Sequence, residues 1–74
     1  MSVAPIRVCI IEDHAVVRAG LKMLLTSEPD IEVVGEAVDR KGALEVGQRE
    51  RPDLFLVDIQ LGRQSAVEIG RAHV

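Results

Sequence analysis

The chain alternates between short apolar runs and segments in which apolar residues recur at helical spacing. The first run, residues 6–11, is β-branched and apolar on both sides apart from Arg7, as expected for a strand covered on both faces. The segment that follows, residues 14–26, carries apolar side chains three or four positions apart. This spacing predicts a helix with Asp13 or His14 near its N-cap.

The same two patterns recur along the rest of the chain. The further elements that they predict are strands over residues 31–37 and 54–58 and helices over residues 39–50 and 65–73. Asp39 is expected to cap the second helix, and Ser65 the last one. The third strand is apolar throughout until Asp58, which indicates a central position in a sheet.

Strands that alternate with helices at these distances form βαβ units, in which right-handed crossovers make the strands parallel. The predicted fold class is therefore α/β, with a parallel three-stranded sheet flanked by helices. When successive helices lie on opposite faces of the sheet, the strand order is second, first, third. This topology opens a crevice between the carboxyl ends of the first and third strands.

Acidic residues follow both of these strands. The topology is expected to bring Glu12, Asp13 and Asp58 within a few ångströms of one another, although they are far apart in sequence. Three carboxylates repel one another unless a cation neutralises them, and Mg2+ prefers oxygen ligands of this kind. A carboxylate beside such a metal can itself attack phosphorus and form an acyl phosphate, so the pattern indicates phosphoryl chemistry.

The composition excludes several other classes of protein. The 74 residues are 47% hydrophobic with a net charge of −3, and no apolar run is long enough to span a membrane. The start of the chain has no secretion signal, so we expect a cytoplasmic protein. The scattered basic residues and the absence of tyrosine and tryptophan disfavour direct nucleic-acid binding. No glycine-rich phosphate loop follows the first strand, which disfavours a nucleotide-binding enzyme.

Three segments together resemble a known family: Ile10 to His14, Val17 to Leu21 and Arg51 to Ile59. They are similar, in order and spacing, to the receiver domain of two-component response regulators, especially the type joined to a helix-turn-helix output. The resemblance covers essentially the whole chain. It implies the CheY-like version of the flavodoxin-like fold and a role in phosphorelay signalling rather than an enzyme.

The resemblance also implies a role for each acidic residue. Asp58 would be the phosphoacceptor, and Mg2+ would be held by Glu12, Asp13, Asp58 and the backbone carbonyl of Gln60. The phosphoryl donor would be a sensor histidine kinase. Two positions depart from the family's common pattern, where Gly62 replaces a proline and Ala66 a glycine. Gly62 would loosen the loop after the phosphoacceptor, but neither change removes a ligand.

Receivers of this family have five strands and five helices, and their switch hydroxyl and their lysine come from the later strands. The chain therefore resembles the N-terminal, three-strand portion of a receiver, and a DNA-binding output is expected only in a parent protein. Two interpretations stay open: a phosphoacceptor module, or an interaction fragment that cannot complete phosphotransfer. The unpaired edge of the third strand predicts a homodimer through that edge and the last helix.

Three further residues have structural interpretations. Cys9 is expected to be a small core residue, and a single cysteine cannot form an internal disulfide. His14 is expected to be a partly exposed residue of the first helical turn. Arg18 is expected on the solvated surface.

Overall fold

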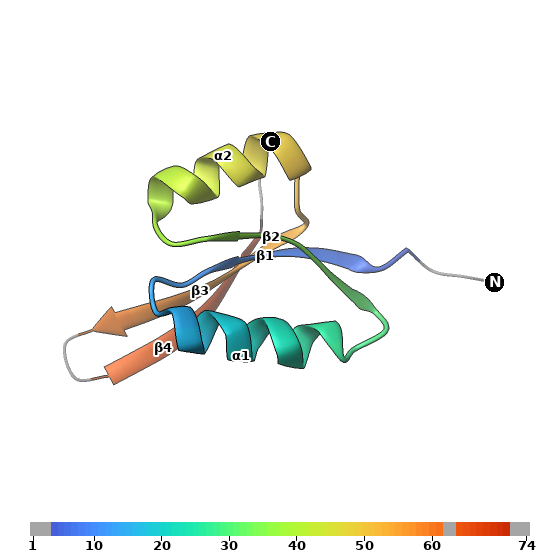
Figure 1. The fold of residues 1–74 in the computed structure, drawn as a ribbon. Helices are drawn as coiled ribbons and strands as arrows, with labels where there is room; N and C mark the ends of the chain where they lie inside the picture. Colours follow the sequence, from blue (N-terminus) through green and yellow to red (C-terminus); the bar gives the residue numbers. More distant parts are fainter. Residues whose placement is uncertain (1–3, 62–63, 72–74) are drawn as a thin grey trace.

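The structure of the protein, a computed structural model, describes residues 4–61 and 64–71, and from residue 58 onward it describes the backbone alone. The elements, in chain order, are β1 (Ile6–Ile11), α1 (Ala15–Thr26), β2 (Ile31–Ala37), α2 (Arg40–Glu50), β3 (Leu54–Leu61) and β4 (Gln64–Arg71). Figure 1 shows α1 on one face of the sheet and α2 on the other. The first two strands match their predicted bounds residue for residue.

The sheet has the order β2-β1-β3-β4, and its first three strands are parallel. Its register pairs Ile6 with Ile31 on one side of β1 and Ile11 with Val57 on the other. This arrangement confirms the predicted α/β class and the second-first-third strand order. It also brings the ends of β1 and β3 together at one edge of the sheet.

Each end of α2 is fixed by local chemistry. The Oδ1 atom of Asp39 accepts a hydrogen bond of 2.8 Å from the backbone N–H of Gly42, which confirms the predicted cap. The helix ends where Arg51 adopts a left-handed conformation with φ of 49°, directly before Pro52. Residue 14 is the N-cap of α1, but its side chain makes no capping hydrogen bond.

The segment predicted as a last helix is a strand instead. β4 runs antiparallel to β3, from the pair Leu61–Gln64 to the pair Leu54–Arg71, and β3 itself continues three residues beyond its predicted end at Asp58. An unpaired strand edge leaves backbone N–H and C=O groups without hydrogen-bond partners. At the edge of β3, the backbone of the following segment provides these partners. Its β-branched residues Val67 and Ile69 suit a strand. The helix predicted over 65–73 is therefore wrong for residues 65–71, and residues 72–74 lie outside the described chain.

The hairpin also corrects the predicted dimer. That prediction required an open edge on β3 and a helix after it. In the structure β4 pairs along the whole length of β3, so the proposed surface is already occupied by the chain's own backbone.

The core lies on and around β1. Cys9 and Ile10 have no exposed surface, and the other core residues among the side chains described, residues 4–57, are Val8, Ala37, Ala43, Val46 and Leu56. Burial, with a smaller contribution from the negative charge of Glu36, raises the pKa of the Cys9 thiol to about 11. Cys9 is thus the inert core residue that the sequence predicts, since a protonated thiol is a poor nucleophile.

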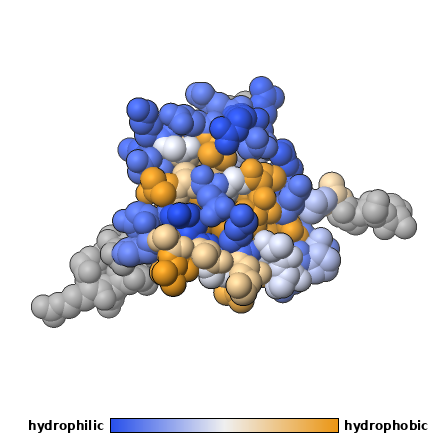
Figure 2. Space-filling model, in the orientation of Figure 1, coloured by the Kyte–Doolittle hydropathy of each residue, from blue (hydrophilic) through white to orange (hydrophobic). Residues whose placement is uncertain are grey.

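The helix α1 has no buried residue and carries several exposed apolar side chains. Val16, Met23 and Leu24 are 85%, 75% and 68% exposed, respectively. Figure 2 shows apolar surface along the lower side of the molecule, where Figure 1 places this helix. Of the two helices, α2 therefore contributes buried side chains to the core, namely Ala43 and Val46, whereas α1 contributes none.

Gly35 is required by the close approach of α2 to β2. It lies at an irregularity in the pairing of β1 with β2, and a Cβ atom there would overlap Cγ1 of Val46. We expect Gly35→Ala to lower the free energy of unfolding by about 1–3 kcal/mol, as overpacking does. A urea titration followed by circular dichroism measures the change.

Gly20→Ala is the matched control. A Cβ atom at Gly20 meets nothing within 4 Å, and the residue lies in the middle of α1. The same substitution should therefore stabilise the protein by about 0.5–1 kcal/mol, because alanine favours a helix over glycine. Two variants that shift stability in the same direction would contradict the steric argument for Gly35.

Candidate functional site

The candidate site begins where β1 ends. Glu12 follows the strand, and its backbone N–H donates a hydrogen bond of 2.9 Å to the carbonyl of Ala37 at the end of β2. The residue is 2% exposed, whereas the side chain of the next residue, Asp13, is 73% exposed. A buried carboxylate therefore lies beside one that is open to solvent.

The ring of His14 lies between these two carboxylates. Its Nδ1 atom is 2.7 Å from Oε1 of Glu12 and 2.9 Å from Oδ1 of Asp13. The backbone N–H of His14 also donates to Oε1 of Glu12 at 2.9 Å. The sequence predicted the two acidic residues but assigned the histidine only to the first helical turn. Its side chain is half exposed, as predicted, and it also contacts the site.

Asp58 lies next to this corner in the register of the sheet. Because Ile11 pairs with Val57 in parallel strands, Asp58 comes one residue after the last pair on β3, just as Glu12 does on β1. The side chain of Asp58 lies outside the described part of the chain, and so does that of Gln60. The convergence of all three carboxylates therefore stays a prediction, supported by the backbone register.

The donor atoms of the described corner suit a hard divalent cation. One atom each from Glu12, Asp13 and His14 lies within 4.8 Å of the others. Carboxylate oxygens are the ligands that Mg2+ prefers, and it commonly binds through one or two carboxylates while retaining several waters. Two adjacent carboxylates, one of them solvent-facing, meet that requirement.

Arg18 is a residue that the sequence interpretation misplaced. Instead of extending into solvent, its side chain is 21% exposed, and Nη1 donates a hydrogen bond of 2.9 Å to the backbone carbonyl of Glu12. Its Nε atom lies 3.3 Å from Oε1 of Glu36 on β2. Its position one turn after His14 was a partial signal, because side chains of a helix lean toward its N-terminus and a long one there can reach the end of β1.

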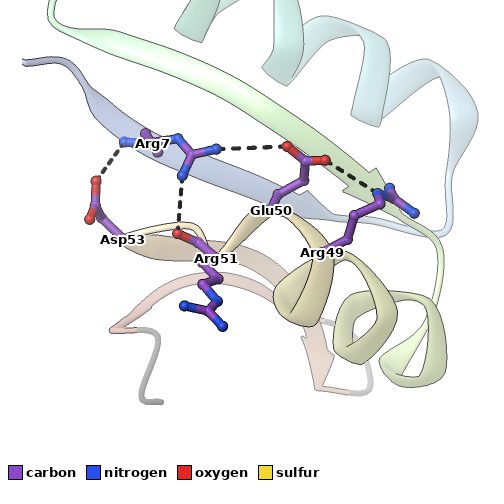
Figure 3. Close-up of polar contacts among 5 residues, drawn as sticks. All are labelled: Arg7, Arg49, Glu50, Arg51 and Asp53. Atoms are coloured by element: carbon purple, nitrogen blue, oxygen red, sulfur yellow. Dashed lines mark hydrogen bonds and ion pairs between the residues drawn. The ribbon is translucent and has the colours of Figure 1, made fainter.

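A second polar cluster lies at the opposite end of β1 (Figure 3). The backbone N–H of Arg7 donates to Oδ2 of Asp53 at 2.9 Å, and the N–H of Asp53 donates to the Arg7 carbonyl at 2.7 Å. The guanidinium of Arg7 also reaches the carbonyl of Arg51 and, at 3.7 Å, the carboxylate of Glu50. These contacts set where β3 begins, so the cluster has a structural role.

The described helices include none that is both long and apolar enough to cross a membrane.

Comparison with known proteins gives a consistent result. The sequence profile of the response regulator receiver domain matches residues 8–72. The chain is 38% identical over 66 residues to the transcriptional regulatory protein DegU of Brevibacillus brevis, covering 89% of this chain and 28% of that protein. It is 39% identical over 64 residues to the response regulator protein VraR of Staphylococcus saprophyticus, covering 86% and 31%.

A relative of another kind shows similar identity. The chain is 42% identical over 67 residues to a protein-glutamate methylesterase/protein-glutamine glutaminase of a Nocardioides species, covering 90% of this chain and 18% of that protein. The chain thus spans less than a third of the length of each of these three relatives. What they share with it is one segment, which contains both the acidic corner and Asp58.

Proposed function

This chain belongs to the response regulator receiver domain family of two-component signalling, and from that premise we propose that it accepts a phosphoryl group on Asp58. In this proposal Glu12 and Asp13 hold Mg2+ together with Asp58 and the Gln60 carbonyl. The observation that carries the proposal is the buried Glu12 beside Asp13 at the end of β1, level with Asp58 in the sheet register.

The proposed reaction is a simple phosphoryl transfer. A carboxylate oxygen of Asp58 attacks phosphorus, the bond from phosphorus to the donor breaks, and its electron pair leaves with the donor group. The product is an acyl phosphate on Asp58. When bound, Mg2+ supplies positive charge that offsets the repulsion between the carboxylates and the phosphoryl oxygens.

The residues of this chain prepare that reaction by position and charge. Glu12 is held by its backbone N–H on β2 and by the contacts of its carboxylate to His14. Asp13 remains open to solvent, from which the cation and the phosphoryl donor arrive. In this proposal the buried carboxylate of Glu12 anchors the cation, and the exposed carboxylate of Asp13 lies on the side from which the cation and the donor approach.

The proposed donor is a sensor histidine kinase, since two-component receivers take their phosphoryl group from such partners. The proposed role is that of a signalling module and not of an enzyme. The similarity to a transcriptional regulatory protein supports a parent protein whose output is transcription. The name of another relative includes a methylesterase activity, but the chain spans 18% of that protein. The activity is therefore not part of this proposal.

Phosphorylation can be tested directly. With Mg2+ and acetyl phosphate, we expect the intact mass of the wild-type chain to increase by one phosphoryl group, because the donor needs no kinase. Asp58→Asn should show no adduct, since it removes the nucleophilic oxygen. Asp30→Asn, at an exposed position between α1 and β2, should retain it.

Two results would contradict the proposal. An adduct of equal amount on Asp58→Asn would place the phosphoryl group elsewhere. A wild-type chain that binds Mg2+ but forms no adduct would favour the alternative, an interaction fragment that cannot complete phosphotransfer.

A further inference from the structure

We propose that Arg18 is a positioning residue for the acidic corner, holding the peptide between Glu12 and Asp13 in the orientation that binds a divalent cation. This inference rests on the proposed function, because it concerns the same Mg2+ site.

The contacts of Arg18 connect three elements of the fold. From α1, its Nη1 donates to the Glu12 carbonyl after β1, and its Nε pairs with Glu36 on β2. A guanidinium group is planar and presents several N–H donors in fixed directions. It can therefore hold two acceptors at a fixed separation, whereas the donors of an ammonium group rotate about a single nitrogen.

The backbone of Glu12 is held from both sides as a result. Its N–H donates to Ala37 on β2, and its carbonyl accepts from Arg18 on α1. The Glu12 carbonyl belongs to the same planar peptide unit as the N–H of Asp13. Fixing that plane limits how the two carboxylates can rotate relative to one another, although Asp13 itself is exposed.

Glu36 also controls the charge of the arrangement. A free guanidinium close to the corner would repel a divalent cation, but Arg18 is paired with the Glu36 carboxylate. The other oxygen of that carboxylate lies 3.1 Å from Nζ of Lys22. The single charge of Glu36 is therefore shared between Arg18 and Lys22, so the positive charge that remains is common to the two residues, whereas the contact with the Glu12 carbonyl belongs to Arg18.

Lys22 offers a matched control within the same helix. It carries the same charge, is one turn further along α1 and pairs with the same Glu36, but its side chain is 54% exposed and contacts Glu36 rather than the Glu12 carbonyl. If charge or the α1–β2 ion pair is what matters for Mg2+ binding, substitutions at Arg18 and Lys22 should have similar effects. If the contact with the Glu12 carbonyl is what matters, only the substitution at Arg18 should weaken binding.

The experiment measures Mg2+ binding to the full chain by isothermal titration calorimetry, well below the unfolding temperature. Arg18→Ala should raise the Kd about tenfold, as removal of a group behind a metal ligand does. Lys22→Ala should change it less than about twofold, because exposed ion pairs contribute little. Arg18→Lys should fall between them, since the donors of an ammonium group rotate about a single nitrogen and hold the two acceptors less rigidly than a guanidinium does.

The amide resonance of Asp13 gives a second readout in the absence of metal. Relative to wild type, its chemical shift should change in Arg18→Ala and remain the same in Lys22→Ala. The reason is that Arg18, unlike Lys22, donates a hydrogen bond to the peptide unit that contains this N–H. The far-ultraviolet circular dichroism spectrum verifies that each variant is folded. If Arg18→Ala does not fold, Arg18→Lys against Lys22→Ala provides the same comparison.

The outcomes separate this inference from the function on which it rests. Equal Kd values for Arg18→Ala and wild type, or equal losses in Arg18→Ala and Lys22→Ala, would overturn the positioning role while leaving the Mg2+ site intact. A wild-type chain that does not bind Mg2+ would overturn both.

Discussion

Glu12→Gln is expected to weaken Mg2+ binding more than about a hundredfold. A unit charge and a divalent cation 4 Å apart attract by about 8 kcal/mol at the effective dielectric constant of 20 that suits sites near a protein surface. If a third of that attraction survives competition with water, its loss amounts to about 2.7 kcal/mol, or about two powers of ten in Kd, and a larger surviving share raises this figure. Glutamine keeps the size of the side chain and an acceptor oxygen for the His14 backbone N–H, so the fold should persist.

Calorimetric titration of the full chain with Mg2+ measures this effect. Asp13→Asn is expected to weaken binding less than Glu12→Gln, because solvent screens the exposed carboxylate of Asp13 more strongly than the buried one. Glu45→Gln removes the same charge from an exposed position on α2, and its Kd should stay within about twofold of wild type. Three variants with the same Kd would mean that net charge, and not this corner, attracts the cation.

The parallel part of the fold could be predicted from the sequence because its pattern is unambiguous. The run over β1 has nearly no polar interruption, and the helix over α2 has a capping Asp39 and a following Pro52. Each of these signals acts locally, within a few residues. The strand order then follows from the handedness of the crossovers.

The last segment could not be assigned in the same way. Val67 and Ile69 alternate with polar neighbours as in a strand, while Ser65 and the apolar residues after it also fit a short helix. A segment this short satisfies both periods. Whether the segment forms a strand or a helix depends on a tertiary contact, the edge of β3. The backbone groups of this edge form hydrogen bonds with the segment that lies beside them.

The acidic pair could be predicted because Glu12 and Asp13 directly follow β1, at the carboxyl end of a parallel strand, where binding sites of such sheets lie. The parts played by His14 and Arg18 depend instead on side-chain directions at the start of α1. A long side chain there can extend into solvent or turn back to the strand end, and composition does not distinguish the two. Only the packing of α1 against β1 and β2 selects the second.

Ile10→Ala is expected to lower the free energy of unfolding by about 2–5 kcal/mol, as deletion of a buried aliphatic side chain does. Ile10 is completely buried in β1, between β2 and β3. For 74 residues the total stability is on the order of 4–11 kcal/mol, so one substitution removes a large part of it. A urea titration followed by circular dichroism measures the loss.

Ile6→Ala is the matched control, because it makes the same chemical change on the same strand. Ile6 is 44% exposed, so alanine there removes less buried surface and leaves no closed cavity. Its effect should be less than half that of Ile10→Ala. Equal losses at the two positions would mean that the chain is stabilised by strand pairing alone. The acidic corner would then lack the rigid support from β1 on which its proposed chemistry depends.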